Sequence, residues 1–210
     1  MMALTGLFLA FFLIIHLAGN LQLLLPEQEA HLQFNAYSHF LSGLLPIKIV
    51  SYLLYASILY HIIDALKLTL ANRKANAQGY KTDNRREVSG WASRNMGLLG
   101  SLLTLFLIIH FKDYWWVYKF GELPVDANGN KDLYLIVMAS FQQWWYVALY
   151  VIAFLALGFH LWHGVSSAFR TMGLYHQRYI LWVKYLGYGY TILITGGFII
   201  IPVLSYLNQL

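Results

Sequence analysis

Long apolar stretches alternate with shorter polar ones along almost the whole chain. A helix that crosses the hydrocarbon core of a membrane needs about 20 consecutive apolar residues. Five stretches reach this length: 4–25, 47–70, 96–117, 144–169 and 180–204. Pro26 and Pro46 stand at two of their ends, where proline is tolerated. The pattern predicts an all-α membrane protein, with residues 1–210 forming a single transmembrane domain of five helices.

One further apolar segment does not fit this count. Residues 132–143 are apolar, but together with 144–169 they are too long for a single span. We therefore expect a short interfacial helix in this segment, which turns before Trp144. The connections are short, so a soluble domain is not expected in this chain.

Composition agrees with the membrane assignment and excludes some cofactors. Of the 210 residues, 59% are hydrophobic and only 11% are charged, which is too apolar for a soluble domain of this size. There is no cysteine, which excludes disulfides, iron–sulfur ligation and covalent c-type haem attachment by this chain. The first residues carry no lysine or arginine, so we expect the first apolar stretch to be a retained helix rather than a signal peptide.

Basic residues are concentrated in two of the connections. The positive-inside rule places such connections in the cytoplasm. The basic residues in and beside them are Lys67, Arg73, Lys74, Lys81, Arg85, Arg86, Arg94, Arg170, Arg178 and Lys184. The N-terminus is therefore expected in the cytoplasm and the C-terminus outside. The aromatic residues at 114–116 and 144–146 would then lie at the outer interface, as a membrane belt or as part of a quinone pocket.

A repeated pentapeptide draws attention to two histidines. The string Phe-Leu-Ile-Ile-His ends at His16 and again at His110, and a glycine stands ten residues before each histidine. The predicted spans hold three more histidines: His61, His160 and His163. Ionisable groups in membrane helices are costly and usually functional.

The depths of these histidines predict two pairs. At about 1.5 Å per residue, His16 and His110 lie toward the outside, and His61 and His160 lie toward the cytoplasm. Two neutral imidazoles that face each other across a helix bundle suit the axial ligation of a b-type haem. We expect the first four helices to form a haem-binding bundle with two haem b groups. His163, one turn after His160, is an alternative ligand, and histidines that only make hydrogen bonds between helices are the alternative to haem binding.

Other residues complete this hypothesis. Small residues would line the haem plates, and cations would bind the propionates near the inner end. The small residues are Gly6, Ala10, Gly97, Gly100 and Gly164, and the cations are Arg94, Arg170 and Lys67. Asp64 is interpreted either as an ion-pair partner of Lys67 or Arg94, or as a hydrogen-bonding partner of a histidine.

The remaining histidines fall outside the spans. His31 and His39 are expected in the outer connection, either as solvated side chains or as groups that exchange protons with a quinone. His176 is expected in a cytoplasmic connection.

Four sequence strings together resemble one family. They are GLFLAFFLIIH at 6–16, Tyr60-His61 followed by Ala65, GLLGSLLTLFLIIH at 97–110, and FHLWHGVSSAFRTMG at 159–173. Over nearly its whole length the chain resembles the cytochrome b subunit of succinate:quinone oxidoreductases, in particular the single-chain, five-helix, di-haem b558 type. His160 stands thirteen residues before Gly173, which is the family spacing for a haem ligand and favours His160 over His163.

The resemblance implies a membrane anchor of respiratory complex II, a succinate dehydrogenase of the tricarboxylic acid cycle or a fumarate reductase. A flavoprotein subunit would carry the dicarboxylate chemistry, and an iron–sulfur subunit would pass electrons to the inner haem. A quinone, menaquinone in this family type, would react near the outer haem. The expected location is the bacterial cytoplasmic membrane, with residues 73–94 as a docking surface, and the whole complex could form an oligomer.

One position departs from the family pattern. Some di-haem members carry a glutamate two residues before the ligand of the fourth helix, where this chain has Gly158. The resemblance therefore gives no support for proton transfer along that route. Two other functions remain open: a di-haem anchor of another quinone-linked enzyme, such as a hydrogenase or formate dehydrogenase, and a non-redox transporter or scaffold.

Overall fold

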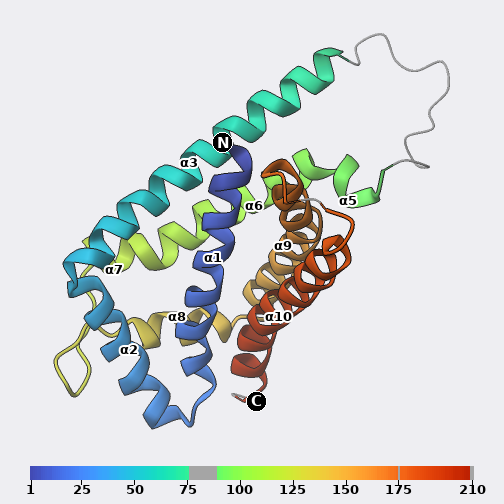
Figure 1. Cartoon of the computed structure of the whole chain (residues 1–210). Coiled ribbons are helices and arrows are strands. Elements are labelled where there is room, and N and C mark those ends of the chain that lie inside the picture. Colours follow the sequence, from blue (N-terminus) through green and yellow to red (C-terminus); the bar gives the residue numbers. More distant parts are fainter. Residues whose placement is uncertain (76–88, 175, 209–210) are drawn as a thin grey trace.

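Five long helices dominate the computed structural model, which describes residues 1–75, 89–174 and 176–208 (Figure 1). The helical segments long and apolar enough to cross a membrane are Met2–Leu24, Leu45–Ala75, Met96–Phe120, Trp144–Thr171 and Ile180–Leu207. The prediction of an all-α membrane protein with five transmembrane helices is confirmed. Each span lies within a few residues of its predicted bounds, although the second continues five residues beyond Leu70 to Ala75.

The first span consists of α1 (Met2–Asn20) and a 3₁₀ turn (Leu21–Leu24). Pro26 does not continue the helix; it stands at the N-cap of a second helix, α2 (Glu27–Gly43). Helix α2 carries His31 and His39, which the sequence analysis expected in a loop. Its first turn contains two glutamates, which stabilise the positive end of the helix dipole.

The second and third spans are α3 (Leu45–Ala75) and a composite helix. The composite helix begins with α6 (Met96–His110), continues as a π-helical segment (Phe111–Trp116) and ends with α7 (Val117–Phe120). A one-turn helix, α5 (Trp91–Arg94), precedes it. The wider π-helical turns begin directly after His110 and change the direction of the side chains that follow; such segments are frequent at functional sites.

A short helix, α8 (Leu133–Phe141), precedes α9 (Trp144–Thr171), so the predicted turn before Trp144 is confirmed. Asp132 caps α8 by accepting a hydrogen bond from the backbone of Leu135 at 3.2 Å. In Figure 1, α2 and α8 lie at the same end of the molecule as the C-terminus, and the end of α3 lies at the opposite end.

Helices α9 and α10 (Ile180–Leu207) contribute more buried residues than the other helices. Tyr150, Ile194 and Phe198 are among the most buried residues of the core, whereas Leu54 is the only buried side chain that the described part of α3 contributes. The hydroxyl of Tyr190 on α10 donates a hydrogen bond to the carbonyl of Ala10 on α1 at 2.6 Å. Helix α10 thus packs against α1 and α9, and α3 presents much of its surface to the surroundings.

Candidate functional site

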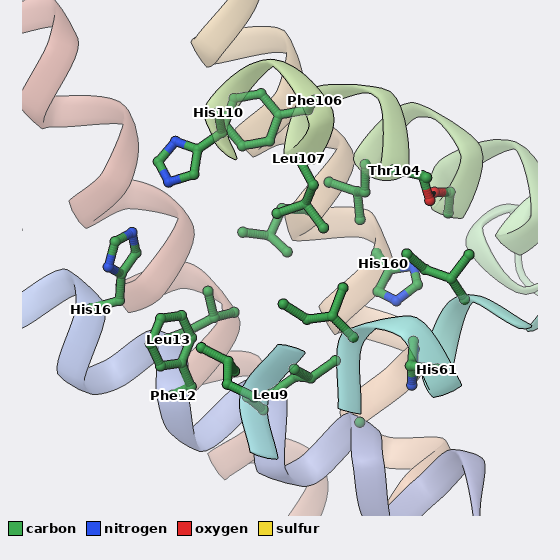
Figure 2. Close-up of a pocket in the computed structure, with 18 of the residues that line it drawn as sticks. Leu9, Phe12, Leu13, His16, His61, Thr104, Phe106, Leu107, His110 and His160 are labelled. Carbon is green, nitrogen blue, oxygen red and sulfur yellow. Dashed lines mark hydrogen bonds between the residues drawn. The ribbon is translucent and has the colours of Figure 1, made fainter. Parts of the chain in front are cut away.

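One large cavity runs between α1, α3, α6 and α9, with a volume of about 2140 Å³. Ligand pockets in proteins usually measure about 300–1,000 Å³, so this cavity has room for more than one large cofactor. We call the end at α2 and α8 the outer end and the opposite one the inner end, names that follow the predicted orientation. Five histidines line the cavity, and four of them form two pairs, one toward each end (Figure 2).

The outer pair consists of His16 on α1 and His110 on α6. Their ring centres lie 5.9 Å apart and their planes are at 87° to each other. The repeated pentapeptide explains how each ring is supported: Phe12 and Phe106 stand four residues before the two histidines, on the same helix face. Phe12 stacks on His16 at 5.2 Å and Phe106 stacks on His110 at 5.7 Å.

The inner pair consists of His61 on α3 and His160 on α9. Their ring centres lie 6.2 Å apart, with an angle of 67° between the planes. Helices from distant parts of the chain therefore bring together the same two pairs that the predicted depths gave.

These distances can be compared with what a shared metal requires. An imidazole nitrogen binds a transition metal at about 2.0 Å, and the ring centre lies about 1.2 Å behind it, so two axial imidazoles have centres roughly 6.4 Å apart. The observed 5.9 and 6.2 Å are close to this value. Rings in direct edge-to-face contact have similar separations. Whether a metal could lie between the two rings therefore also depends on the hydrogen bonds of the ring nitrogens and on the open space between the helices.

Two of the four histidines are hydrogen-bonded as metal-binding histidines usually are, with the second ring nitrogen facing an acceptor. His110 Nδ1 lies 3.1 Å from the Tyr150 hydroxyl, and His61 Nδ1 lies 3.1 Å from the Thr5 hydroxyl. A hydroxyl oxygen accepts from Nδ1–H, which leaves Nε2 of these two rings to bind a ligand. His16 differs, because its Nδ1 lies 3.4 Å from Nδ2 of Asn20, an amide nitrogen that donates, so that Nδ1 is the acceptor in this contact. His160 Nδ1 is buried and has no hydrogen-bond partner within the described residues.

Two of the predicted small residues provide open space at the cavity wall. A Cβ atom at Gly100 or at Gly164 would meet no atom within 4 Å, and both residues line the cavity. Gly6 and Gly97 have other roles. A Cβ at Gly6 would lie 3.4 Å from the ring of His61, and one at Gly97 would lie 3.2 Å from Thr69. Gly100 and Gly164 therefore leave space at the cavity wall, which a flat cofactor beside the histidines would need.

The basic residue that lines the inner end of the cavity is not one of the three that the sequence predicted. Lys67, Arg94 and Arg170 are not among the described residues that line the cavity, whereas Arg73 lines it at the inner end. Helix α3 continues past its predicted end, which brings Arg73 to this position. The outer end has its own polar side chains: Lys48 lines it, and the Ser42 and Tyr118 hydroxyls lie 3.1 Å apart there.

The other candidate residues have varied surroundings. His163 also lines the cavity and is half-buried, but it is His160 whose ring faces His61. His39 and His176 are exposed. Asp64 is half-buried at the cavity wall and makes no ion pair within the part of the chain that the structure describes. Within the expected docking region, Lys81, Arg85 and Arg86 lie outside the described residues.

The position that departs from the family pattern is filled by a neighbouring helix. A Cβ atom at Gly158 would lie 3.1 Å from the hydroxyl of Thr195 on α10. A longer side chain at this position would require α9 and α10 to separate. The close packing of α9 against α10 therefore leaves room at position 158 for glycine, which has no side chain.

The hydrogen-bond partners of the histidines were not identified from the sequence. Asn20 could have been identified from the sequence, because it stands four residues after His16, one turn along the same helix. Tyr150 and Thr5 belong to other helices than the histidines that they contact, and no local pattern marks them.

Searches of protein-family models, curated proteins and solved structures give no match to this chain. Within the described residues, no group of three or more histidine, aspartate and glutamate side chains is arranged to hold a metal ion. The two histidine pairs and the cavity that they line are therefore the features of this chain that bear on its function.

Proposed function

We propose that this protein is the membrane-anchoring cytochrome b subunit of a succinate:quinone oxidoreductase, a succinate dehydrogenase or fumarate reductase. One observation carries the proposal: two pairs of histidines line the same cavity. The two ring centres lie 5.9 Å apart in the outer pair and 6.2 Å apart in the inner pair. The sequence resemblance supplies the enzyme class, and the geometry supports the number of cofactors and their ligands.

Each histidine pair would hold one haem b. His61 and His160 bind the inner haem, and His16 and His110 bind the outer one. When bound, each haem takes up and gives back one electron, so the two together carry electrons across the membrane. The chain itself positions the rings, excludes water with apolar side chains and offers Arg73 to the carboxylates at the inner end.

The outer end of the cavity is the proposed place for the quinone, with menaquinone favoured by the family. Ser42, Tyr118 and Lys48 are polar groups that could orient a quinone oxygen there. A flavoprotein and an iron–sulfur subunit would bind on the cytoplasmic side, at the inner end. The proposed location is the bacterial cytoplasmic membrane, with the N-terminus inside.

The other candidate functions differ in what they predict. An anchor of a hydrogenase or formate dehydrogenase would contain haem but would not purify with a flavoprotein. In a non-redox transporter or scaffold, the paired histidine rings would only contact each other edge to face, and the purified protein would be colourless. The single ligand on each of four helices favours the first function.

The test is a reduced-minus-oxidised visible spectrum of the protein purified from membranes, with haem and protein quantified. About two b haems per chain, reduced by succinate and reoxidised by a quinone, would support the proposal. A colourless protein would contradict it. Haem that succinate cannot reduce in a complex without covalently bound flavin would favour another quinone-linked enzyme.

A further inference from the structure

The His110 ring has one specific polar contact on the side of Nδ1. The hydroxyl oxygen of Tyr150, on α9, lies 3.1 Å from this nitrogen. If His110 binds iron through Nε2, then Nδ1 carries the proton, so that the N–H donates and the tyrosine oxygen accepts. The direction of this hydrogen bond follows from the ligand role.

Tyr150 is held firmly in this position. Its side chain is only 3% exposed. Its ring centre lies 4.9 Å from Phe106, 5.3 Å from Phe141 and 5.6 Å from Phe154. Phe106 also stacks on His110, so the histidine and the tyrosine share one packing partner. Neither ring can turn without displacing buried aromatic side chains.

The inner pair has a different environment. Thr5 lies 3.1 Å from His61 Nδ1, and its hydroxyl also bonds to the carbonyl of Met2 at 3.1 Å. His160, the α9 ligand of that pair, has no partner at Nδ1 within the described residues. The two proposed haems would therefore have ligands of different electron-donating strength.

We propose that Tyr150 is a positioning residue that orients His110 and lowers the reduction potential of the outer haem. A hydrogen bond from Nδ1–H makes the imidazole a stronger electron donor, which stabilises ferric iron relative to ferrous iron. This inference rests on the proposed function, because it assigns a role toward a cofactor that His16 and His110 would bind. Tyr150 belongs to a different helix from His16 and His110, and it would change the reduction potential of the outer haem without changing that of the inner one.

The experiment is a redox titration of the purified complex at one fixed pH, followed by the visible spectrum. Tyr150→Phe keeps the ring and its packing but removes the accepting oxygen. We expect the midpoint potential of the outer haem to rise and that of the inner haem to stay unchanged. The same change in a His160→Ala background, which retains only the outer haem, identifies the haem that moves.

Thr5→Val is the matched control, because it removes a hydroxyl from the other pair and keeps the side-chain size. It should raise the potential of the inner haem and leave the outer one unchanged. An outer potential that is the same in Tyr150→Phe and in the unsubstituted protein would overturn the inference. So would an equal shift of both haems, which would indicate a general structural disturbance.

Two results separate this inference from the proposed function. If the unsubstituted protein contains no haem, both are overturned. If it contains two haems but Tyr150→Phe shifts neither, only the inference fails. If Tyr150→Phe loses its haem, 3-fluorotyrosine placed at position 150 decides: it keeps the shape but weakens the acceptor, so a small rise of the outer potential supports the inference and an unchanged potential overturns it.

Discussion

His31 Nε2 and Asp132 Oδ2 lie 2.7 Å apart, although 101 positions separate the two residues in the sequence. Asn35, which is fully buried, also bonds to Asp132: its Nδ2 donates to Asp132 Oδ1 at 2.9 Å, and its Oδ1 accepts from the backbone of Tyr134 at 3.0 Å. This network joins α2 to the start of α8. Phe34 on α2 and Val137 on α8 line the outer end of the cavity, so the network holds that end together.

Asn35→Ala should lower the thermal stability of the purified protein. The substitution leaves the buried backbone N–H of Tyr134 without its partner, at a cost of about 1–3 kcal/mol. It also removes one of the two donors to Asp132 Oδ1, which keeps its hydrogen bond from the backbone of Leu135. The measurement is the melting temperature in detergent, followed by circular dichroism. Gln33→Ala is the control on the same helix, because the side chain of Gln33 donates to Glu29 on the exposed face. Equal melting temperatures for the two variants would show that the network adds no stability.

Replacement of a proposed ligand should remove one haem and leave the other. His16→Ala and His110→Ala should each lose the outer haem, and His61→Ala and His160→Ala the inner one, because a single axial imidazole holds the iron less firmly than two. The measurement is the haem content per chain by pyridine haemochrome assay, with about half of the original value expected. Loss of both haems from every variant would mean that the bundle, rather than the individual pairs, had failed.

His163→Ala should retain both haems. Although His163 lines the cavity, its neighbour His160 faces His61, with 6.2 Å between the ring centres. The visible spectrum and the haem content of this variant should equal those of the unsubstituted protein. A His163→Ala protein without its inner haem, together with a His160→Ala protein that keeps it, would reverse the assignment of the ligand on α9.

Gly100→Leu should reduce haem content without unfolding the protein. A side chain at this position would point into the open space of the cavity, where nothing lies within 4 Å, and would occupy the volume assigned to a haem plate. Gly189→Leu is the matched control, because that glycine also has no neighbour within 4 Å but lies on the exposed face of α10. Haem content should fall in the first variant only. Equal haem content in both would indicate that no plate lies beside Gly100.

The loop before α8 should loosen at acidic pH. Burial alone would raise the pKa of Asp126, but the backbone N–H groups of Asn130 and Asn128 bond to its carboxylate and hold the pKa below its usual value. The charged form is therefore favoured in the folded loop, and its stabilising effect is present above about pH 4 and lost as the pH falls through the lowered pKa.

Hydrogen exchange of the peptide containing 125–131, corrected for the intrinsic rate, measures this effect. Exchange should accelerate below about pH 4 in the unsubstituted protein. In Asp126→Asn the loop should exchange at a rate that does not depend on pH over the same range. An unchanged acid response in that variant would assign the titration to another group.

The five spans and the position of each histidine along its helix could be predicted from the sequence. Apolar length predicts the spans, and counting residues from their ends predicts which histidines lie at the same level, because rise along a helix is proportional to residue number. The repeated Phe-Leu-Ile-Ile-His strings also place each phenylalanine on the helix face of its histidine, since residues four apart share a face. This spacing was not used to predict a contact, and the structure shows Phe12 stacked on His16 and Phe106 stacked on His110. These are local relationships within one helix.

The contacts that each histidine makes with other helices were decided only by the tertiary structure. The rotation of a helix about its axis and the partner it meets depend on side chains packed together from distant parts of the chain. For this reason Tyr150 could not be distinguished from other tyrosines, and Arg73 rather than Arg94 or Arg170 lines the inner end of the cavity. Helix α2 was missed for a related reason: its mixed polar sequence is neither a membrane span nor a turn, and the contacts of its buried Asn35 with Asp132 and Tyr134 at the start of α8 give it a defined place.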